Sequence, residues 1–222
     1  MTPNEITTVL ATALNKTFDT PFKLMIMERV HVWRSRLIKN SLDKTPADRK
    51  FFRAVIYVRL SKVPEVPCDL PVEVCDIAQT VTLPTPLRAN SITFDYVGSI
   101  NGANSFKEIQ SGALAYLRSG KYSKNVVGYS YNNGNKTISV YGNPDLPMIR
   151  IEFIPDNPAD IASYSCTPDT NVLCDFWNTE YPCSNDILQQ ILQFIVEVDF
   201  GQKKETVPEI SVVVNPENDI QQ

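Results

Sequence analysis

The chain has 222 residues, of which 43% are hydrophobic and 21% charged, and its formal net charge is −4. This length suits one large globular domain or two small ones. No apolar run approaches 18 residues, which predicts that no helix spans a membrane. The first residues lack a basic segment followed by an apolar core, so we expect no secretory signal and a protein that stays in the cytoplasm where it is made.

The charge is distributed unevenly along the chain. Eleven basic residues and only three acidic ones lie between Lys23 and Lys62, whereas the rest of the chain has 10 basic and 22 acidic residues. This division favours a basic surface that meets an acidic partner or another copy of the same chain. A solvated helix face with no specific role is an equal alternative. Nucleic-acid binding is less favoured, because the basic segment carries no nucleic-acid-binding motif.

The N-terminal region predicts a helical hairpin and a short third helix. Thr2-Pro3-Asn4-Glu5 is a capping box that begins a helix over residues 3–17. Thr20-Pro21 begins a longer helix, to about Asn40, with a predicted apolar stripe of Phe22, Met25, Ile26, Val30, Trp33 and Leu37. Thr45-Pro46-Ala47-Asp48 is a further capping box that begins a short helix or turn.

The middle of the chain is predicted to be rich in antiparallel strands. Arg53–Ser61 alternates with a period of two, which indicates a strand with one buried face. Further strands are expected at residues 92–97, 126–131, 138–141 and 148–154, and Asn132-Asn133-Gly134-Asn135 predicts a hairpin turn. The segment 106–117 is ambiguous, with a helix slightly favoured, and the proline-rich stretch from Pro64 to Pro86 suggests an extended path.

The C-terminal region predicts a short helix after Asn157-Pro158 and an amphipathic helix over residues 184–199. Together the elements indicate an α+β fold: helical over 1–50, β-rich over 51–155, and mixed with a closing helix over 156–202. We expect residues 1–202 to form a single domain, followed by an extended arm at 203–222. A short β-capable segment, Ile210–Val214, lies between two prolines in this arm.

No catalytic or metal-binding motif is recognisable. The five cysteines have no CxxC spacing, and His31 is the single histidine, so we expect reduced thiols, no metal site and no cofactor. A nucleophilic mechanism would depend on His31, and no phosphate-binding glycine loop occurs. Carboxylates alone, such as Asp156 with Asp160 or Asp95, are the remaining route to an enzyme, but capping and turn roles explain them. We therefore expect a protein without catalytic activity.

Several strings of the sequence are distinctive and resemble one family. They are Asn4-Glu5-Ile6, Phe22-Lys23, Arg29-Val30, Trp33-Arg34-Ser35-Arg36-Leu37-Ile38, Asp43-Lys44, Asp48-Arg49-Lys50-Phe51-Phe52, Leu83-Pro84-Thr85-Pro86-Leu87-Arg88, Phe94-Asp95-Tyr96-Val97-Gly98-Ser99 and Asp186-Ile187-Leu188-Gln189-Gln190-Ile191. They are similar to a head–tail connector, or neck ring, protein of crAss-like short-tailed bacteriophages, over most of the chain to about Phe200. The order of elements also resembles the tail adaptors of short-tailed phages, which is a weaker likeness.

This resemblance implies a structural virion protein. It implies a homo-oligomeric ring, of twelve copies like the portal, that docks below the portal protein and contacts the adjacent neck or tail ring proteins. Double-stranded DNA would pass through the channel without specific binding during genome ejection, and no membrane is involved. The alternative is a protein-binding module that bridges phage or host proteins without forming a ring.

Candidate assembly residues come from three places in the sequence. The basic helix contributes Arg29, His31, Arg34, Arg36 and Lys39, of which the four charged residues are expected on one exposed face. Trp177 lies in a predicted loop, where an exposed ring would mark a contact. Ile210, Val212 and Val214 of the arm are expected to add a strand to a neighbouring subunit.

Overall fold

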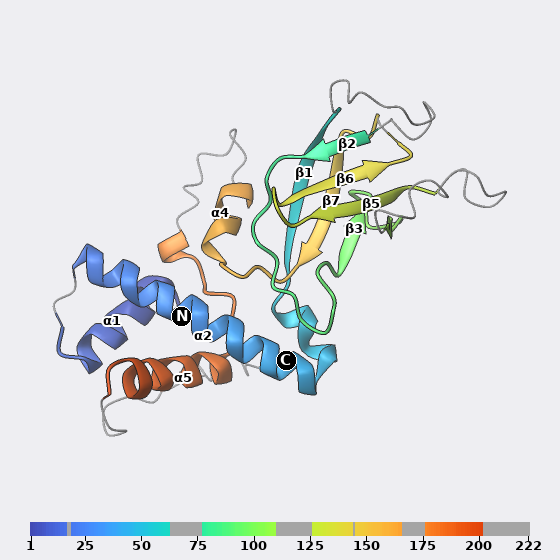
Figure 1. The fold of residues 1–222 in the computed structure, drawn as a ribbon. Helices are drawn as coiled ribbons and strands as arrows, with labels where there is room; N and C mark the ends of the chain where they lie inside the picture. Colours follow the sequence, from blue (N-terminus) through green and yellow to red (C-terminus); the bar gives the residue numbers. More distant parts are fainter. Residues whose placement is uncertain (17–18, 63–76, 110–125, 144, 166–175, 202–222) are drawn as a thin grey trace, which may run out of the picture. The chain divides into compact units, whose positions relative to one another are not determined.

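The computed structural model describes residues 1–16, 19–62, 77–109, 126–143, 145–165 and 176–201 (Figure 1). The chain divides into two compact units. The first consists of Met1–Leu37 together with the chain from Trp177 on, and the second is Ile38–Phe176. The α+β fold with a β-rich middle and a C-terminal helix is confirmed. The expectation of a single domain over residues 1–202 stays a prediction.

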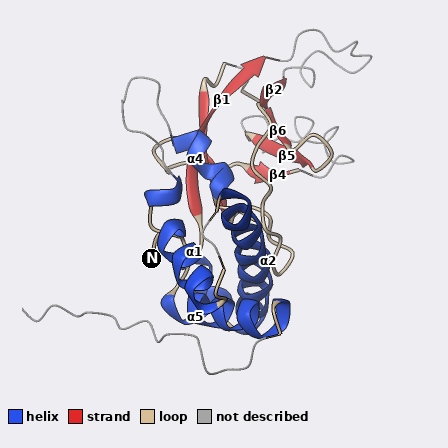
Figure 2. Ribbon diagram, turned by 90° about the vertical axis from the view of Figure 1, so that its left-hand side faces the viewer, coloured by secondary structure: helices blue, strands red, loops and turns tan. Residues whose placement is uncertain are grey.

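The first unit is built from helices α1 (Pro3–Ala13), α5 (Asn185–Phe194) and the part of α2 (Thr20–Lys44) that ends at Leu37. Each helix buries one side, as its spacing of apolar residues requires. The fully or almost fully buried side chains are Ile6 and Leu10 of α1, Ile26 and Val30 of α2, and Leu188, Ile191 and Leu192 of α5. Figure 2 shows these helices in blue.

The capping box predicted at Thr2 is confirmed, whereas the start of α2 is capped by Asp19, whose carboxylate accepts a hydrogen bond from the Phe22 amide at 2.9 Å. At α1, the Thr2 side chain accepts a hydrogen bond from the Glu5 amide, and the Glu5 carboxylate accepts one from the Thr2 amide at 2.8 Å. Ser184 caps α5, whose last turn continues as the π-helix η4 (Ile195–Asp199). The capping box at Thr45 is wrong. Thr45 makes no side-chain cap and α2 extends to Lys44, but the short helix expected here is confirmed as the 3-10 helix η1 (Pro46–Phe51).

The second unit contains a seven-stranded sheet in the order β3-β7-β1-β2-β6-β5-β4. The strands are β1 (Ala54–Lys62), β2 (Ile77–Thr80), β3 (Tyr96–Gly98), β4 (Lys107–Glu108), β5 (Gly128–Asn132), β6 (Thr137–Tyr141) and β7 (Met148–Phe153). Strand β1 joins the part of the sheet with β3 and β7 to the part with β2, β6, β5 and β4. Its residues Ala54–Arg59 pair with β7, and Leu60–Lys62 pair with β2. The sheet curls, because β3 and β4 are joined by a short hairpin in which the Phe106 amide donates to the Val97 carbonyl.

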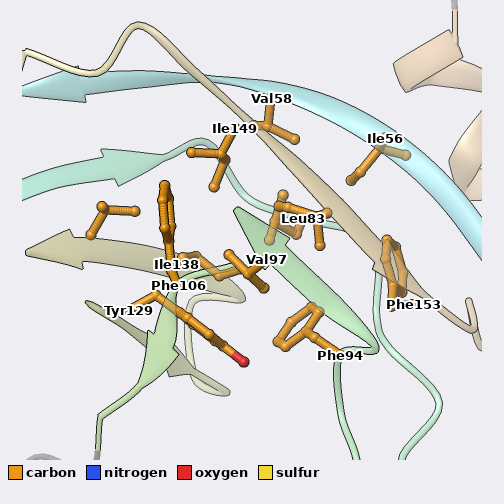
Figure 3. Packing of buried hydrophobic residues seen from close by; sticks show 12 residues of the cluster. Ile56, Val58, Leu83, Phe94, Val97, Phe106, Tyr129, Ile138, Ile149 and Phe153 are labelled. Atoms are coloured by element: carbon orange, nitrogen blue, oxygen red, sulfur yellow. The ribbon is translucent and has the colours of Figure 1, made fainter. Parts of the chain in front are cut away.

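The core of this unit lies on one face of the curled sheet. Register pairs such as Ile56 with Ile151 and Tyr129 with Val140 bring buried side chains together across neighbouring strands. Figure 3 shows Ile56 and Tyr129 converging with Phe94, Phe106 and Leu83. Helix α4 (Ala159–Ser165) adds Ile161 and Tyr164 to this core, and the Tyr164 hydroxyl donates to the Thr82 carbonyl.

Three predictions for the sheet are wrong. The strands are not all antiparallel, because β4 pairs in parallel with β5. The slight preference for a helix in 106–117 fails at Lys107–Glu108, which form β4, while residues 110–117 lie outside the described part. The strand expected at 92–97 begins only at Tyr96. Asn90 and Ser91, with φ of 51° and 62°, form a tight turn that returns the chain from Ala89 to Ile92.

The hairpin between β5 and β6 is confirmed, but its strained residue is not the expected one. Lys136 has a φ of 54°, whereas positive φ was expected at asparagine or glycine. We predict that Lys136→Gly raises the free energy of unfolding by up to about 1 kcal/mol, since left-handed strain disappears and only part of that gain is lost to unfolded-chain entropy. Urea unfolding followed by circular dichroism measures this change. Asn135→Gly, at a residue without positive φ, is the control and is expected to destabilise; equal gains in both variants would contradict the prediction.

Candidate assembly surface

Helix α2 makes polar contacts with the segment that precedes α5. The His31 ring nitrogen Nδ1 lies 2.9 Å from the Tyr181 hydroxyl, and the two rings are tilted at a centroid distance of 5.7 Å. Tyr181 is buried, and its amide donates to the Met1 carbonyl, which brings the start of α1 to the same place. Burial raises the pKa of Tyr181 well above its usual range, so its hydroxyl stays protonated and can donate. His31 therefore has a structural role inside the unit.

Arg34 does not lie on an exposed basic face, and this part of the sequence interpretation is wrong. Its side chain is 0% exposed, and Nε donates to the Pro182 carbonyl at 3.1 Å. The buried positions of α2 recur every four residues, at Ile26, Val30, Arg34, Ile38 and Leu42. Arg34 occupies the central one of these positions. A charged group so deeply buried needs hydrogen-bonding partners within the protein, so Arg34 fixes the chain before α5.

Burial beside Arg34 also affects the thiol of Cys183, which is free and half-buried. Burial raises its pKa from 9.0 to about 11, although the nearby Arg34 and a hydrogen bond from the Ser184 backbone lower it. The other four cysteines lie outside the described residues.

We predict that Cys183 reacts slowly with iodoacetamide at pH 8, because the thiolate is the reactive form and is present at roughly one part in a thousand there. Since the thiol keeps its proton to higher pH in the folded than in the unfolded chain, this group contributes stability that is lost as the pH rises above 9.0. Peptide mapping by mass spectrometry measures the labelling. The denatured chain is the control, and equal labelling rates in the two states would contradict the prediction.

A stacked column of side chains covers one end of the α2–α5 contact. The Trp33 ring stacks on Phe194 with centroids 4.9 Å apart, and its indole nitrogen donates to Asp199 at 3.1 Å. The Arg36 guanidinium lies 5.1 Å from the centroid of the Trp33 ring, within reach of a cation–π interaction. Trp33 was expected in the core; it is half-buried, and the arginine that lies over its ring is exposed.

The outer side of α2 carries an exposed surface of mixed character, which we call the α2 stripe: Met25, Arg29, Val32 and Arg36. These residues have the spacing of one helix face, and Met25 and Val32 are 41% and 45% exposed. Leu24, beside them, is 55% exposed. The expected burial of Met25 is therefore wrong, and Met27 is buried in its place. Exposed apolar side chains next to arginines are typical of an interaction surface.

The remaining predicted residues fall in different places. Lys39 is exposed on the last turns of α2, within the second unit. Trp177 lies in the 3-10 helix η3 (Phe176–Asn178) and is half-buried. Ile210, Val212 and Val214 lie outside the described residues. The structure thus brings Arg29 and Arg36 together on one face, with exposed apolar residues that the sequence interpretation placed elsewhere or overlooked.

The described residues contain no group of three histidine, cysteine or acidic side chains that could hold a metal ion. Among the helices of that part of the chain, none combines the length and apolarity needed to cross a membrane. What the structure does present is a small α+β protein with an exposed apolar and basic helix face, the features of a subunit built for protein–protein contact.

The comparison with protein families leads to the same class. The model of the family described as phage tail ring protein 2, CrAss_Ring_2, matches residues 19–218 of the 222. The chain belongs to this family of ring proteins of crAss-like phages, which gives it a structural role in the phage tail and makes it a virion component. No curated protein matches the chain.

Proposed function

We propose that the chain forms a homo-oligomeric ring, of twelve copies, that docks below the portal and continues the DNA channel toward the tail. The observation that carries this proposal is the family match over residues 19–218. The exposed α2 stripe supports it, since a subunit that joins others needs an accessible apolar surface. In this role the protein acts by shape and charge, without catalysis.

The charge of the chain supports passage of DNA rather than binding. Outside residues 23–62 the chain has 22 acidic and 10 basic residues. A lumen lined by such a surface repels the phosphate backbone, so the DNA slides without being held. The basic side of α2 is then better suited to contacts between proteins than to the nucleic acid.

Electron microscopy of the protein co-expressed with the portal and tail proteins of its phage tests the proposal. We expect rings stacked on the portal with the same rotational order. Isolated copies bound at single sites would support instead the alternative role of a bridging module without a ring. Purified protein alone is a weaker sample, because connector subunits often assemble only on their platform.

The C-terminal arm contributes a separate prediction. Residues 203–222 lie outside the described part of the chain, and their sequence includes the β-capable Ile210–Val214. We expect the chain without residues 203–222 to keep its circular dichroism spectrum and melting temperature but to incorporate poorly into portal-bound rings. If the shortened chain unfolds instead, the arm belongs to the core of its own subunit. A chain shortened only by residues 218–222 serves as the control.

A further inference from the structure

Helix α5 and its π-helical end carry a second exposed stripe, which we call the α5 stripe: Asp186, Gln190, Gln193 and Glu197. The first two are exposed and the other two half-buried, and Gln193 donates to Glu197 at 3.0 Å. The stripe has a carboxylate at each end and no basic residue. Val198, next to Glu197, is 59% exposed. The unit therefore has an acidic and amide-rich face on α5 in addition to the basic and apolar face on α2.

The two stripes have the same spacing. Both place four residues at positions i, i+4, i+7 and i+11, so each extends about 16 Å along its helix. In an antiparallel arrangement Arg36 would face Asp186, and Arg29 would face the end with Gln193 and Glu197. The same register places Met25 against Glu197 and Val32 against Gln190. Positive charge then meets negative charge at Asp186, and Arg29 lies one helical turn from Glu197.

The stripes are available for this contact because other residues hold the two helices together within a subunit. Trp33, Arg34 and Tyr181 make the contacts between α2 and the region of α5, and none of them belongs to a stripe. A contact between two different surfaces of identical chains is heterologous, and repetition of such a contact closes a ring when the rotation permits.

We propose that the α2 stripe of one copy packs against the α5 stripe of the next copy, and that this contact joins the subunits of the ring. This inference rests on the proposed function, since it names the surfaces through which the ring is formed. Individual exposed ion pairs are weak, so the contact depends on both arginine positions together and on covering the exposed Met25 and Val32.

Charge reversal tests the contact. The first variant is Arg29→Glu with Arg36→Glu, and the second is Asp186→Lys with Glu197→Lys. We expect each variant alone, co-expressed with the portal and tail proteins, to form at least about tenfold fewer rings, because like charges then face each other. Native mass spectrometry and electron microscopy count the rings.

Mixing the two variants provides the decisive result. A reversed α2 stripe then meets a reversed α5 stripe, and the two unchanged stripes meet each other, so alternating rings are expected to return to near wild-type yield. A chain with all four substitutions is expected to form rings on its own. The matched control, Arg59→Glu with Lys107→Glu, reverses two exposed charges in the second unit and is expected to leave ring yield unchanged.

The outcomes separate this inference from the proposed function. If the wild-type chain forms no rings with the portal, the proposed function fails. If wild-type rings form and the reversed variants form them equally well, or if mixing restores nothing, only the contact between stripes is wrong. Asp186 lies in the first turn of α5, where lysine weakens the helix. Gln190→Lys with Glu197→Lys therefore replaces the second variant if its melting temperature falls.

Discussion

Phe153→Ala is expected to lower the free energy of unfolding by about 3–5 kcal/mol, a large share of the stability of a small protein. Phe153 ends β7 and is 0% exposed. Its ring packs against Phe94 with centroids 5.9 Å apart, and its register partner on β1 is the small Ala54. The neighbouring strands cannot close the space that the ring leaves, since their positions are set by pairing. The cavity cost therefore adds to the lost burial.

Urea unfolding, followed both by circular dichroism and by tryptophan fluorescence, measures this effect. Val55→Ala is the matched control, because Val55 lies on the neighbouring strand but is 38% exposed on the other face of the sheet, and we expect a change within about 0.5 kcal/mol. Both tryptophans of the chain, Trp33 and Trp177, belong to the first unit, whereas Phe153 belongs to the second. A shift of the circular dichroism transition alone would show that the units unfold separately. Equal effects of the two substitutions would contradict the placement of Phe153 in the core.

Much of the fold was predictable because its signals are local. The cap at Thr2, the alternation of β1 and the turn before Lys136 each depend on a few consecutive residues. Strand β2 has no such signal. It has only four residues at the end of a proline-rich stretch, and its pairing with β1 and β6 comes from residues distant in the sequence. Non-local pairing of this kind overrides weak local preference.

The candidate surface was only partly predictable for a related reason. Arg29 and Arg36 were placed correctly on an exposed face, but charge alone also assigned Arg34 to it. The repeat of buried residues every four positions, from Ile26 to Leu42, passes through Arg34 and was the available signal for its burial. The α5 stripe was overlooked because its polar residues are ordinary for a solvent-facing side of an amphipathic helix. The α5 stripe became a candidate contact surface only when its spacing and charge were compared with those of the α2 stripe.

Loss of the ion pair between Arg49 and Asp95 is the second change that is expected to lower the free energy of unfolding strongly. The Arg49 Nε lies 2.6 Å from one carboxylate oxygen of Asp95, and Nη2 donates to the other at 3.2 Å. Nη1 donates to the Ala89 carbonyl at 3.2 Å. The side chains are only 8% and 15% exposed. This pair therefore fixes η1 to the residue that precedes β3.

Asp95→Ala is expected to lower the free energy of unfolding by about 3–5 kcal/mol, because it leaves the buried guanidinium of Arg49 without its carboxylate. Arg49→Met combined with Asp95→Leu is expected to lose less than Asp95→Ala alone, since no charge then stays buried. Asp145→Ala is the control: its ion pair with Lys62 is 81% and 69% exposed, and its loss should cost at most about 1 kcal/mol. Urea unfolding compares the three variants. If Asp95→Ala costs no more than Asp145→Ala, the ion pair does not hold η1 to the residue that precedes β3.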